Sequence, residues 1–214
     1  MPYDNIIVDF DGTISDSKKD IARSQLWVLE RLGVQGRREE DLYPFIGMPL
    51  EETFRRLLPP ALHDRIDEAS DLYAAYYPSH SLLTTRLFPG VRTTLERLRS
   101  RGKKIAVAST KRGPGIRRAT DHFGITPLFD RLQGSEGLPF KPDPAIIHVI
   151  LEAERWGPET TIMVGDTAMD VMAGKNAGIA TCGVTYGAMS QDQIQAAAPD
   201  FVIGEFSALL PLVE

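Results

Sequence analysis

Two aspartates separated by one residue, Asp9 and Asp11, follow the first apolar stretch of the chain. That stretch, residues 3–8 (YDNIIV), is short and rich in β-branched residues, which predicts a buried strand. Carboxylates at the tip of such a strand lie where sheet hydrogen bonding ends, so they can point into a crevice. Because close carboxylates repel each other, either one is neutral or a cation lies between them. A solvated turn or a helix cap would also explain the segment.

Ser109 and Thr110 follow a second apolar stretch, residues 104–108 (KIAVA), which also predicts a buried strand. A hydroxyl group followed by backbone amides is suited to hold a phosphoryl oxygen. Lys111 comes next and is a candidate for binding substrate charge. Serine and threonine also cap helices throughout proteins, so this segment alone leaves both interpretations open.

Lys141 stands in the segment 140–144 (FKPDP), directly before a predicted helix. Proline is tolerated in the first turn of a helix, so one interpretation is an ordinary helix start with an exposed lysine. The other is a rigidly aimed ammonium that neutralises a carboxylate nucleophile and a phosphate together.

A third predicted strand, residues 161–164 (TIMV), leads into Asp166, and Asp170 follows four residues later. This spacing brings two carboxylates together at the start of a helix. Negative groups are favourable at a helix N-terminus, so capping explains them. Paired aspartates at a strand end also suit a hard cation with oxygen ligands, such as Mg²⁺.

From about residue 87 onward, predicted strands and helices alternate. The predicted helices cover residues 91–101, 115–122, 144–153 and 169–177, and the predicted strands cover residues 104–108, 129–132, 161–164, 179–185 and 201–203. This alternation indicates βαβ units, a parallel sheet and an open, doubly wound α/β fold. In such folds the site lies beyond the carboxyl ends of the strands, where the polar segments would meet.

Residues 17–83 break this alternation. Three helices are predicted there, at 21–32, 50–58 and 62–77, with no convincing strand between them. A helical block inserted after the first strand is expected to form a cap. We therefore expect an α/β core domain of residues 1–15 and 86–214 and an all-helical cap domain of residues 16–85. Turn-forming residues near both junctions are expected to act as hinges.

The polar segments follow one another in the order DFDGT, ST, KP and GDxxxD. In this order they resemble the haloacid dehalogenase (HAD) superfamily of Mg²⁺-dependent phosphohydrolases. The resemblance covers essentially the whole chain, and the helical block stands where the C1 class of this superfamily carries its cap. DFDGTISDS, FPGV, KPDP, VGDTAMDVMAGKNAG and GVTYG are similar to the phosphoglycolate phosphatase-like subfamily. The resemblance implies a phosphatase that acts on a small phosphate ester.

The resemblance also implies how the reaction would run. Asp9 would attack phosphorus and carry an aspartyl phosphate. Asp11 would protonate the leaving oxygen and later take a proton from the hydrolytic water. Lys141 would offset the negative charge of Asp9 and of the incoming phosphate.

The resemblance further implies a metal site and a substrate site. Mg²⁺ would be bound by the side chains of Asp9 and Asp166 and by the backbone carbonyl of Asp11. Asp170 would orient these ligands. Ser109 would bind phosphoryl oxygens, together with the backbone amides near Phe10 and Thr110. The Lys111 ammonium lies near this site in the sequence and is a further candidate for binding substrate.

Several alternatives stay open. Asp11 favours a phosphate ester or anhydride, because dehalogenases and phosphonatases of the superfamily lack a carboxylate there. A sugar-phosphate mutase would keep both aspartates. Residues 45–50 (FIGMPL) are apolar where such mutases carry polar groups, which favours hydrolysis, although core packing of the cap explains this segment equally well. Pyrophosphate and nucleotides are alternative substrates. A non-catalytic binding module is the remaining alternative.

The composition and charge of the chain argue against some classes of binding partner. The 214 residues are 43% hydrophobic and 25% charged, as in globular proteins. With a net charge of −5 and no basic stripe, no duplex nucleic acid partner is expected. No apolar run is long enough to cross a membrane, the first residues lack secretory signal features, and a single cysteine, Cys182, excludes an internal disulfide. We expect a cytoplasmic monomer or homodimer.

Overall fold

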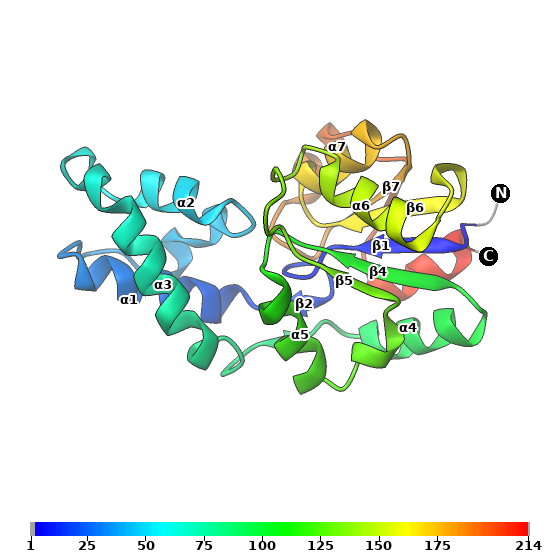
Figure 1. Ribbon diagram of the computed structural model, residues 1–214, viewed down its shortest axis with the longest axis horizontal. Helices are drawn as coiled ribbons and strands as arrows, with labels where there is room; N and C mark the ends of the chain where they lie inside the picture. Colours follow the sequence, from blue (N-terminus) through cyan, green and yellow to red (C-terminus); the bar gives the residue numbers. More distant parts are fainter. Residues whose placement is uncertain (1–2, 214) are drawn as a thin grey trace. The chain divides into compact units, whose positions relative to one another are not determined.

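The structure, a computed structural model, describes residues 3–213, and the chain divides into two compact units (Figure 1). The first unit combines the residues up to Asp16 with those from Leu87 onward. The second unit is Ser17–Arg86. No helix of the described residues is both long and apolar enough to cross a membrane.

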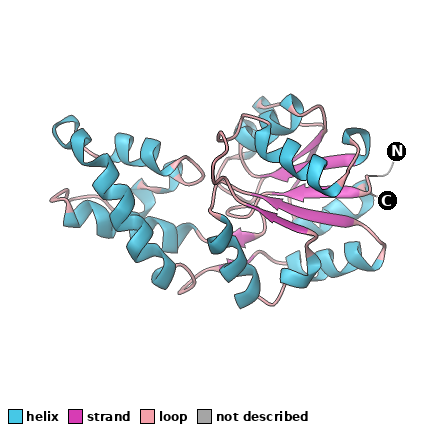
Figure 2. Cartoon of the chain, in the orientation of Figure 1, coloured by secondary structure: helices cyan, strands magenta, loops and turns pink. Residues whose placement is uncertain are grey.

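A six-stranded parallel sheet, with the order β5-β4-β1-β6-β7-β8, forms the centre of the first unit (Figure 2). Its strands are β1 (Asn5–Val8), β4 (Lys104–Ala108), β5 (Arg131–Gln133), β6 (Thr161–Gly165), β7 (Ala180–Val184) and β8 (Phe201–Ile203). In the middle of the sheet, Val8 of β1 is in register with Val107 of β4 and Val164 of β6. The chain leaves β1 toward β4 and later returns to its other side, and ligands bind at such a reversal of strand order.

Helices cover both faces of this sheet. They are α4 (Val91–Ser100), α5 (Gly113–His122), α6 (Ala145–Glu154), α7 (Ala168–Asn176) and α8 (Gln191–Ala196), and the 3-10 segment η6 (Phe206–Leu212) follows. On one face, Ile146 and Ile150 of α6 pack against Ile7 and Ala106. Figure 1 shows α4 and α5 on the opposite face. Burial on both faces explains why the strands are continuous apolar runs.

Two short strands pair where the chain passes between the units, β2 (Ser15–Asp16) and β3 (Arg86–Leu87). The second unit is helical. It contains α1 (Lys18–Arg31), α2 (Leu50–Leu57) and α3 (Ile66–His80), with the 3-10 segments η1 (Glu39–Asp41), η2 (Tyr43–Phe45) and η3 (Pro60–Arg65). Leu29, Leu42 and Phe54 are fully buried in its own hydrophobic core.

A buried carboxylate, Asp20, joins the two ends of the helical unit. It lies in the first turn of α1 and accepts hydrogen bonds of 2.7–3.1 Å from the backbone N–H and hydroxyl groups of Thr84 and Thr85. Burial alone would raise the pKa of Asp20. The hydrogen bonds, led by the Thr85 hydroxyl, outweigh burial and lower this pKa below its ordinary value. The charged carboxylate therefore stabilises the start and the end of this unit together.

The predicted α/β fold is confirmed, and most predicted elements form with ends that differ by a few residues. The predicted strand 104–108 is β4. The predicted helix 62–77 instead begins as η3, and α3 continues to His80. The sequence prediction missed β2, β3, α8 and η6, because strands of two residues and helices of six or seven residues are too short to show a clear hydrophobic period.

Candidate active site

Asp9 lies directly after β1 and is buried. Its N–H donates to the Val164 carbonyl at 2.9 Å, which continues the sheet ladder one residue past the strand. Its carboxylate Oδ1 accepts from Lys141 Nζ at 2.8 Å. The candidate nucleophile therefore has both a fixed backbone and a fixed carboxylate oxygen.

The Lys141 ammonium stands at the centre of a buried cluster. Its Nζ donates to Asp9 Oδ1 at 2.8 Å, to Asp170 Oδ1 at 2.5 Å and to the Ala108 carbonyl at 2.8 Å, which uses all three of its N–H donors. Burial alone would lower the pKa of Lys141, but the charges of Asp170 and Asp9 outweigh burial and raise it. The side chain is 3% exposed, so the interpretation of an exposed helix-start lysine is wrong.

Asp170 is both a helix cap and a partner of Lys141. Its Oδ2 accepts from the Thr167 N–H at 3.1 Å and from the Thr167 hydroxyl at 2.6 Å, and Thr167 Oγ1 accepts from the Asp170 N–H at 3.3 Å. This capping box begins α7. The capping interpretation of this spacing is therefore confirmed, and the other oxygen, Oδ1, faces Lys141. The metal interpretation stays a prediction.

Asp166 is fully buried at the end of β6. Its Oδ1 accepts from the Thr13 hydroxyl at 3.0 Å and its Oδ2 from the Ala188 N–H at 2.7 Å. Burial and the nearby charge of Asp170 raise the pKa of Asp166 to about 7, against the lowering effect of these hydrogen bonds. Gly12 has a φ of +89°, and a Cβ atom there would lie 2.1 Å from Asp166 Oδ2. Only glycine fits this approach.

One carboxylate oxygen from each of Asp9, Asp166 and Asp170 lies within 4.8 Å of the other two. When ionised, these carboxylates bring three negative charges to a cluster in which Lys141 supplies one positive charge. Burial raises the pKa of Asp9 well above its ordinary value, although Lys141 acts against this. A buried set of carboxylate oxygens that lacks positive charge fits a hard divalent cation such as Mg²⁺.

Asp11 lies beside Lys111, with 3.0 Å between Asp11 Oδ2 and Lys111 Nζ and each side chain 11% exposed. Asp11 follows β1 and Lys111 follows β4, the neighbouring strand, so the sheet brings these two residues together. The acid–base role expected for Asp11 stays a prediction. The substrate contact expected for Lys111 stays a prediction.

Ser109 and Thr110 form a loop that is held by the last residue of β5 and by Ser135 shortly after it. The Ser109 N–H donates to the Gln133 carbonyl at 3.1 Å, and its hydroxyl oxygen accepts from the Lys111 N–H at 3.2 Å. The Thr110 carbonyl accepts from the Ser135 hydroxyl at 2.8 Å. Hydrogen bonds within the candidate phosphate-binding loop and to the end of β5 therefore hold its backbone in place.

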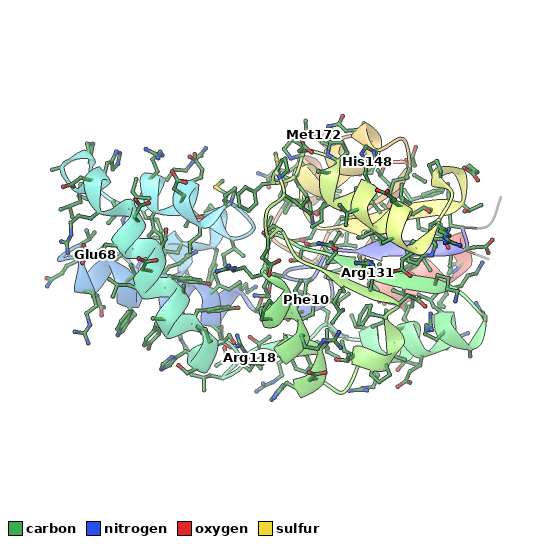
Figure 3. The ribbon with its side chains drawn as sticks, in the orientation of Figure 1. Phe10, Glu68, Arg118, Arg131, His148 and Met172 are labelled. Carbon is green, nitrogen blue, oxygen red and sulfur yellow. The ribbon has the colours of Figure 1, made fainter. Side chains whose placement is uncertain are left out.

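Phe10 lies between the two predicted catalytic aspartates, yet its side chain is buried (labelled in Figure 3). Its carbonyl accepts from the backbone N–H groups of Ile14 and Ser15 at 3.1 and 3.0 Å, which closes the turn after Asp9. A contribution to substrate binding would come from its backbone amide.

The sequence prediction missed the residues that hold Asp166. Thr13 and Ala188 contact its carboxylate, and the Tyr186 hydroxyl donates to the Thr13 carbonyl at 2.9 Å. Tyr186 and Ala188 lie in the segment that follows β7, directly beside β6 in the sheet. Because this segment follows a predicted strand, its position alone could have marked it as part of the candidate site.

A family model described as haloacid dehalogenase-like hydrolase matches residues 6–184, most of the chain. The chain belongs to this family. The resemblance predicted from the sequence motifs is therefore confirmed, and with it the hydrolase class. In this family member, Asp9, Ser109 and Asp166 directly follow β1, β4 and β6, while Lys141 lies in the segment between β5 and α6 and Asp170 in the first turn of α7.

Three curated relatives span nearly the whole chain and carry different names. The pyrophosphatase PpaX of Bacillus velezensis is 33% identical, covering 96% of this chain and 94% of that protein. A phosphoglycolate phosphatase of Vibrio parahaemolyticus is 30% identical, covering 97% and 95%. A 5'-nucleotidase of Pseudomonas aeruginosa is 32% identical, covering 100% and 97%. All three names describe the hydrolysis of phosphate compounds.

A solved structure of a haloacid dehalogenase-like family hydrolase from Streptococcus pneumoniae is also similar. Its TM-score is 0.89 at 27% identity, and the match covers 99% of each chain. The similarity extends over both units, because the match leaves almost no residue of this chain outside it.

Proposed function

We propose that this chain is a Mg²⁺-dependent phosphatase that hydrolyses a small phosphate ester through an aspartyl phosphate on Asp9. The strongest single support is the buried position of Asp9 at the tip of the central strand, 2.8 Å from Lys141 and grouped with Asp166 and Asp170. A carboxylate held this way is oriented for attack but cannot approach an anionic phosphate without positive charge around it.

In the first half of the reaction, an Asp9 oxygen attacks phosphorus and forms a new P–O bond as the ester P–O bond breaks. Asp11 gives its proton to the leaving oxygen. In the second half, water attacks phosphorus, Asp11 takes the water proton, and the bond between phosphorus and Asp9 breaks. The products are inorganic phosphate and an alcohol.

The remaining polar groups balance charge and hold the phosphoryl group. Lys141 offsets the charge of Asp9, and Ser109 with the backbone amides near Phe10 and Thr110 binds phosphoryl oxygens. The side chains of Asp9 and Asp166 would hold Mg²⁺, together with the Asp11 backbone carbonyl implied by the family resemblance, and Asp170 would orient these ligands. When bound, Mg²⁺ supplies positive charge that offsets the repulsion between the nucleophile and the phosphate dianion.

A phosphoglycolate-like monoester is the substrate class we favour, since one relative carries that name and Asp11 can protonate an alkoxide leaving group. Pyrophosphate and nucleoside monophosphates are the alternatives that the other two relatives suggest. We take the helical unit, Ser17–Arg86, as the cap that sets specificity. A sugar-phosphate mutase would differ by requiring a bisphosphate activator.

The test is release of inorganic phosphate from a panel of phosphoglycolate, pyrophosphate, nucleoside monophosphates and sugar phosphates, with Mg²⁺ or with EDTA. We expect turnover that EDTA stops and Mg²⁺ restores. Asp9→Asn should abolish turnover, whereas Asp4→Asn, at the opposite end of β1, should not. Acid quenching and borohydride reduction should convert the phosphorylated Asp9 to homoserine, which mass spectrometry detects. Full activity of Asp9→Asn, or turnover without metal, would refute the mechanism.

A further inference from the structure

Two loops enclose the Asp166 carboxylate. The loop after β1 contributes Gly12 and the Thr13 hydroxyl, and the loop after β7 contributes Gly187 and the Ala188 N–H. A Cβ atom on Gly187 would lie 2.5 Å from both Asp166 Oδ2 and the Gly12 carbonyl. The two loops therefore touch the carboxylate and each other without room for another atom.

Tyr186 joins these two loops. It lies one residue before Gly187, and its hydroxyl donates to the Thr13 carbonyl at 2.9 Å. Its ring packs against the Phe88 ring, with 4.8 Å between the centroids and an angle of 59° between the planes. The ring contact fixes the direction of the hydroxyl, so the hydrogen bond fixes the backbone of Thr13.

We infer that Tyr186 is a positioning residue for the metal-binding carboxylate Asp166 and acts through Thr13. The inference rests on the proposed function in one respect, namely that Asp166 binds Mg²⁺. Thr13 is fully buried, so loss of the tyrosine hydroxyl takes a hydrogen-bond donor away from a buried carbonyl, which is costly. Without the hydroxyl, the Thr13 backbone is less restrained, and its own hydroxyl holds Asp166 Oδ1 less firmly.

A merely structural role would need only the ring of Tyr186. Phenylalanine would fill the same space against Phe88 and bury the same carbon atoms. The hydroxyl adds one hydrogen bond, to the Thr13 carbonyl, and the Thr13 side chain in turn donates to Asp166. Burial, with a smaller effect from the Asp166 charge, raises the pKa of Tyr186, so the hydroxyl stays a neutral donor at physiological pH.

The experiment is a calorimetric Mg²⁺ titration of Tyr186→Phe in the absence of substrate. We expect the Kd for Mg²⁺ to rise by about tenfold, the low end of the effect of residues that orient metal ligands. Tyr3→Phe, which removes a hydroxyl at the amino end of the sheet, is the matched control and should keep the wild-type Kd. Thermal melts should show that both variants are folded.

Thr13→Val completes a double-mutant cycle. If Tyr186 acts through Thr13, the double variant should bind Mg²⁺ about as weakly as Thr13→Val alone. An unchanged Kd in folded Tyr186→Phe would overturn the inference, as would effects of the two substitutions that simply add. If the wild-type protein itself bound no Mg²⁺, the metal role in the proposed function would fail together with this inference.

Discussion

Lys141 Nζ lies 2.5 Å from Asp170 Oδ1, and each of these side chains is only 3% exposed. The other oxygen of the same carboxylate closes the capping box with Thr167. One aspartate thus begins a helix and holds the lysine that faces Asp9. The start of α7 and the buried cluster around Lys141 are therefore joined through a single side chain.

Asp170→Asn should lower phosphate release by roughly 10–100-fold, because the amide removes the charge that holds Lys141 beside Asp9 and that orients the metal ligands. Thr167→Val is the matched variant, since it removes the hydroxyl from the capping box and leaves the Asp170 carboxylate in place. It should cost about 1 kcal/mol of stability and much less activity. Steady-state kinetics and thermal melts on both variants separate the two roles. Equal activity losses would mean that Asp170 acts only as a cap.

The affinity for Mg²⁺ should depend on pH through Asp166. Its folded pKa, about 7, lies above the ordinary value of 3.8. In the metal-free protein this group therefore contributes stability below about pH 4, and that stability is lost as pH rises through 7. Because Mg²⁺ must displace the proton, its affinity should rise by about tenfold per pH unit below pH 7 and then level off.

Calorimetric titrations between pH 5.5 and 8.5 test this dependence. The increase in melting temperature caused by Mg²⁺ should also be larger at pH 8 than at pH 6. Asp166→Asn should bind Mg²⁺ weakly and with a smaller slope, which then comes from Asp9, whose pKa is also raised. An affinity that stays flat across the range would contradict the raised pKa.

Asp20→Ala should destabilise the helical unit, because Thr84 and Thr85 would lose a buried, charged acceptor. The expected loss is roughly 3 kcal/mol at pH 7. The folded pKa of Asp20 is lowered, so its contribution is present above the ordinary pKa near 4 and is lost as pH falls through the folded value. The difference in melting temperature between wild type and variant should therefore narrow as pH falls below about 4.

Asp71→Ala, which removes an exposed carboxylate from α3, is the control for that experiment. It should change stability by less than about 0.5 kcal/mol. A loss at pH 7 as large as that of Asp20→Ala would show that net charge, not the hydrogen-bonded network, is responsible.

Asn176→Ala should impair the loop that carries Lys141. The Asn176 amide, on the last turn of α7, donates to the Pro142 carbonyl at 2.9 Å. Losing a hydrogen bond of about 1 kcal/mol could lower kcat by about fivefold if the whole loss appears in the position of Lys141. The Kd for Mg²⁺ should change less than kcat.

The neighbouring Lys175 provides the matched control, since it also donates to a backbone carbonyl, that of Ala197, at 2.8 Å. Lys175→Ala removes an equivalent bond at the same end of α7 without touching the Lys141 loop. Its kcat should equal that of wild type. Parallel losses in both variants would mean that the end of α7, not the contact with Pro142, is what matters.

The sequence by itself determined the α/β fold and the edge of the sheet at which the candidate site lies. The apolar runs at 104–108 and 161–164 form buried strands because their residues match a sheet covered on both faces. The polar residues Asp9, Ser109 and Asp166 meet because the carboxyl ends of parallel strands lie at one edge. Local patterns and strand direction are enough for these predictions, and they are enough to indicate the family.

Only the tertiary structure decided which charges pair. Lys141 pairs with Asp9 and Asp170, while Lys111 pairs with Asp11, and no local spacing distinguishes these choices. The link from Tyr186 to Thr13 spans 173 positions of sequence. Such contacts depend on where loops from separate strands come to rest after packing. Hydrophobic periodicity cannot predict them, because it indicates which side of a helix or strand is buried but not which side chains that side contacts.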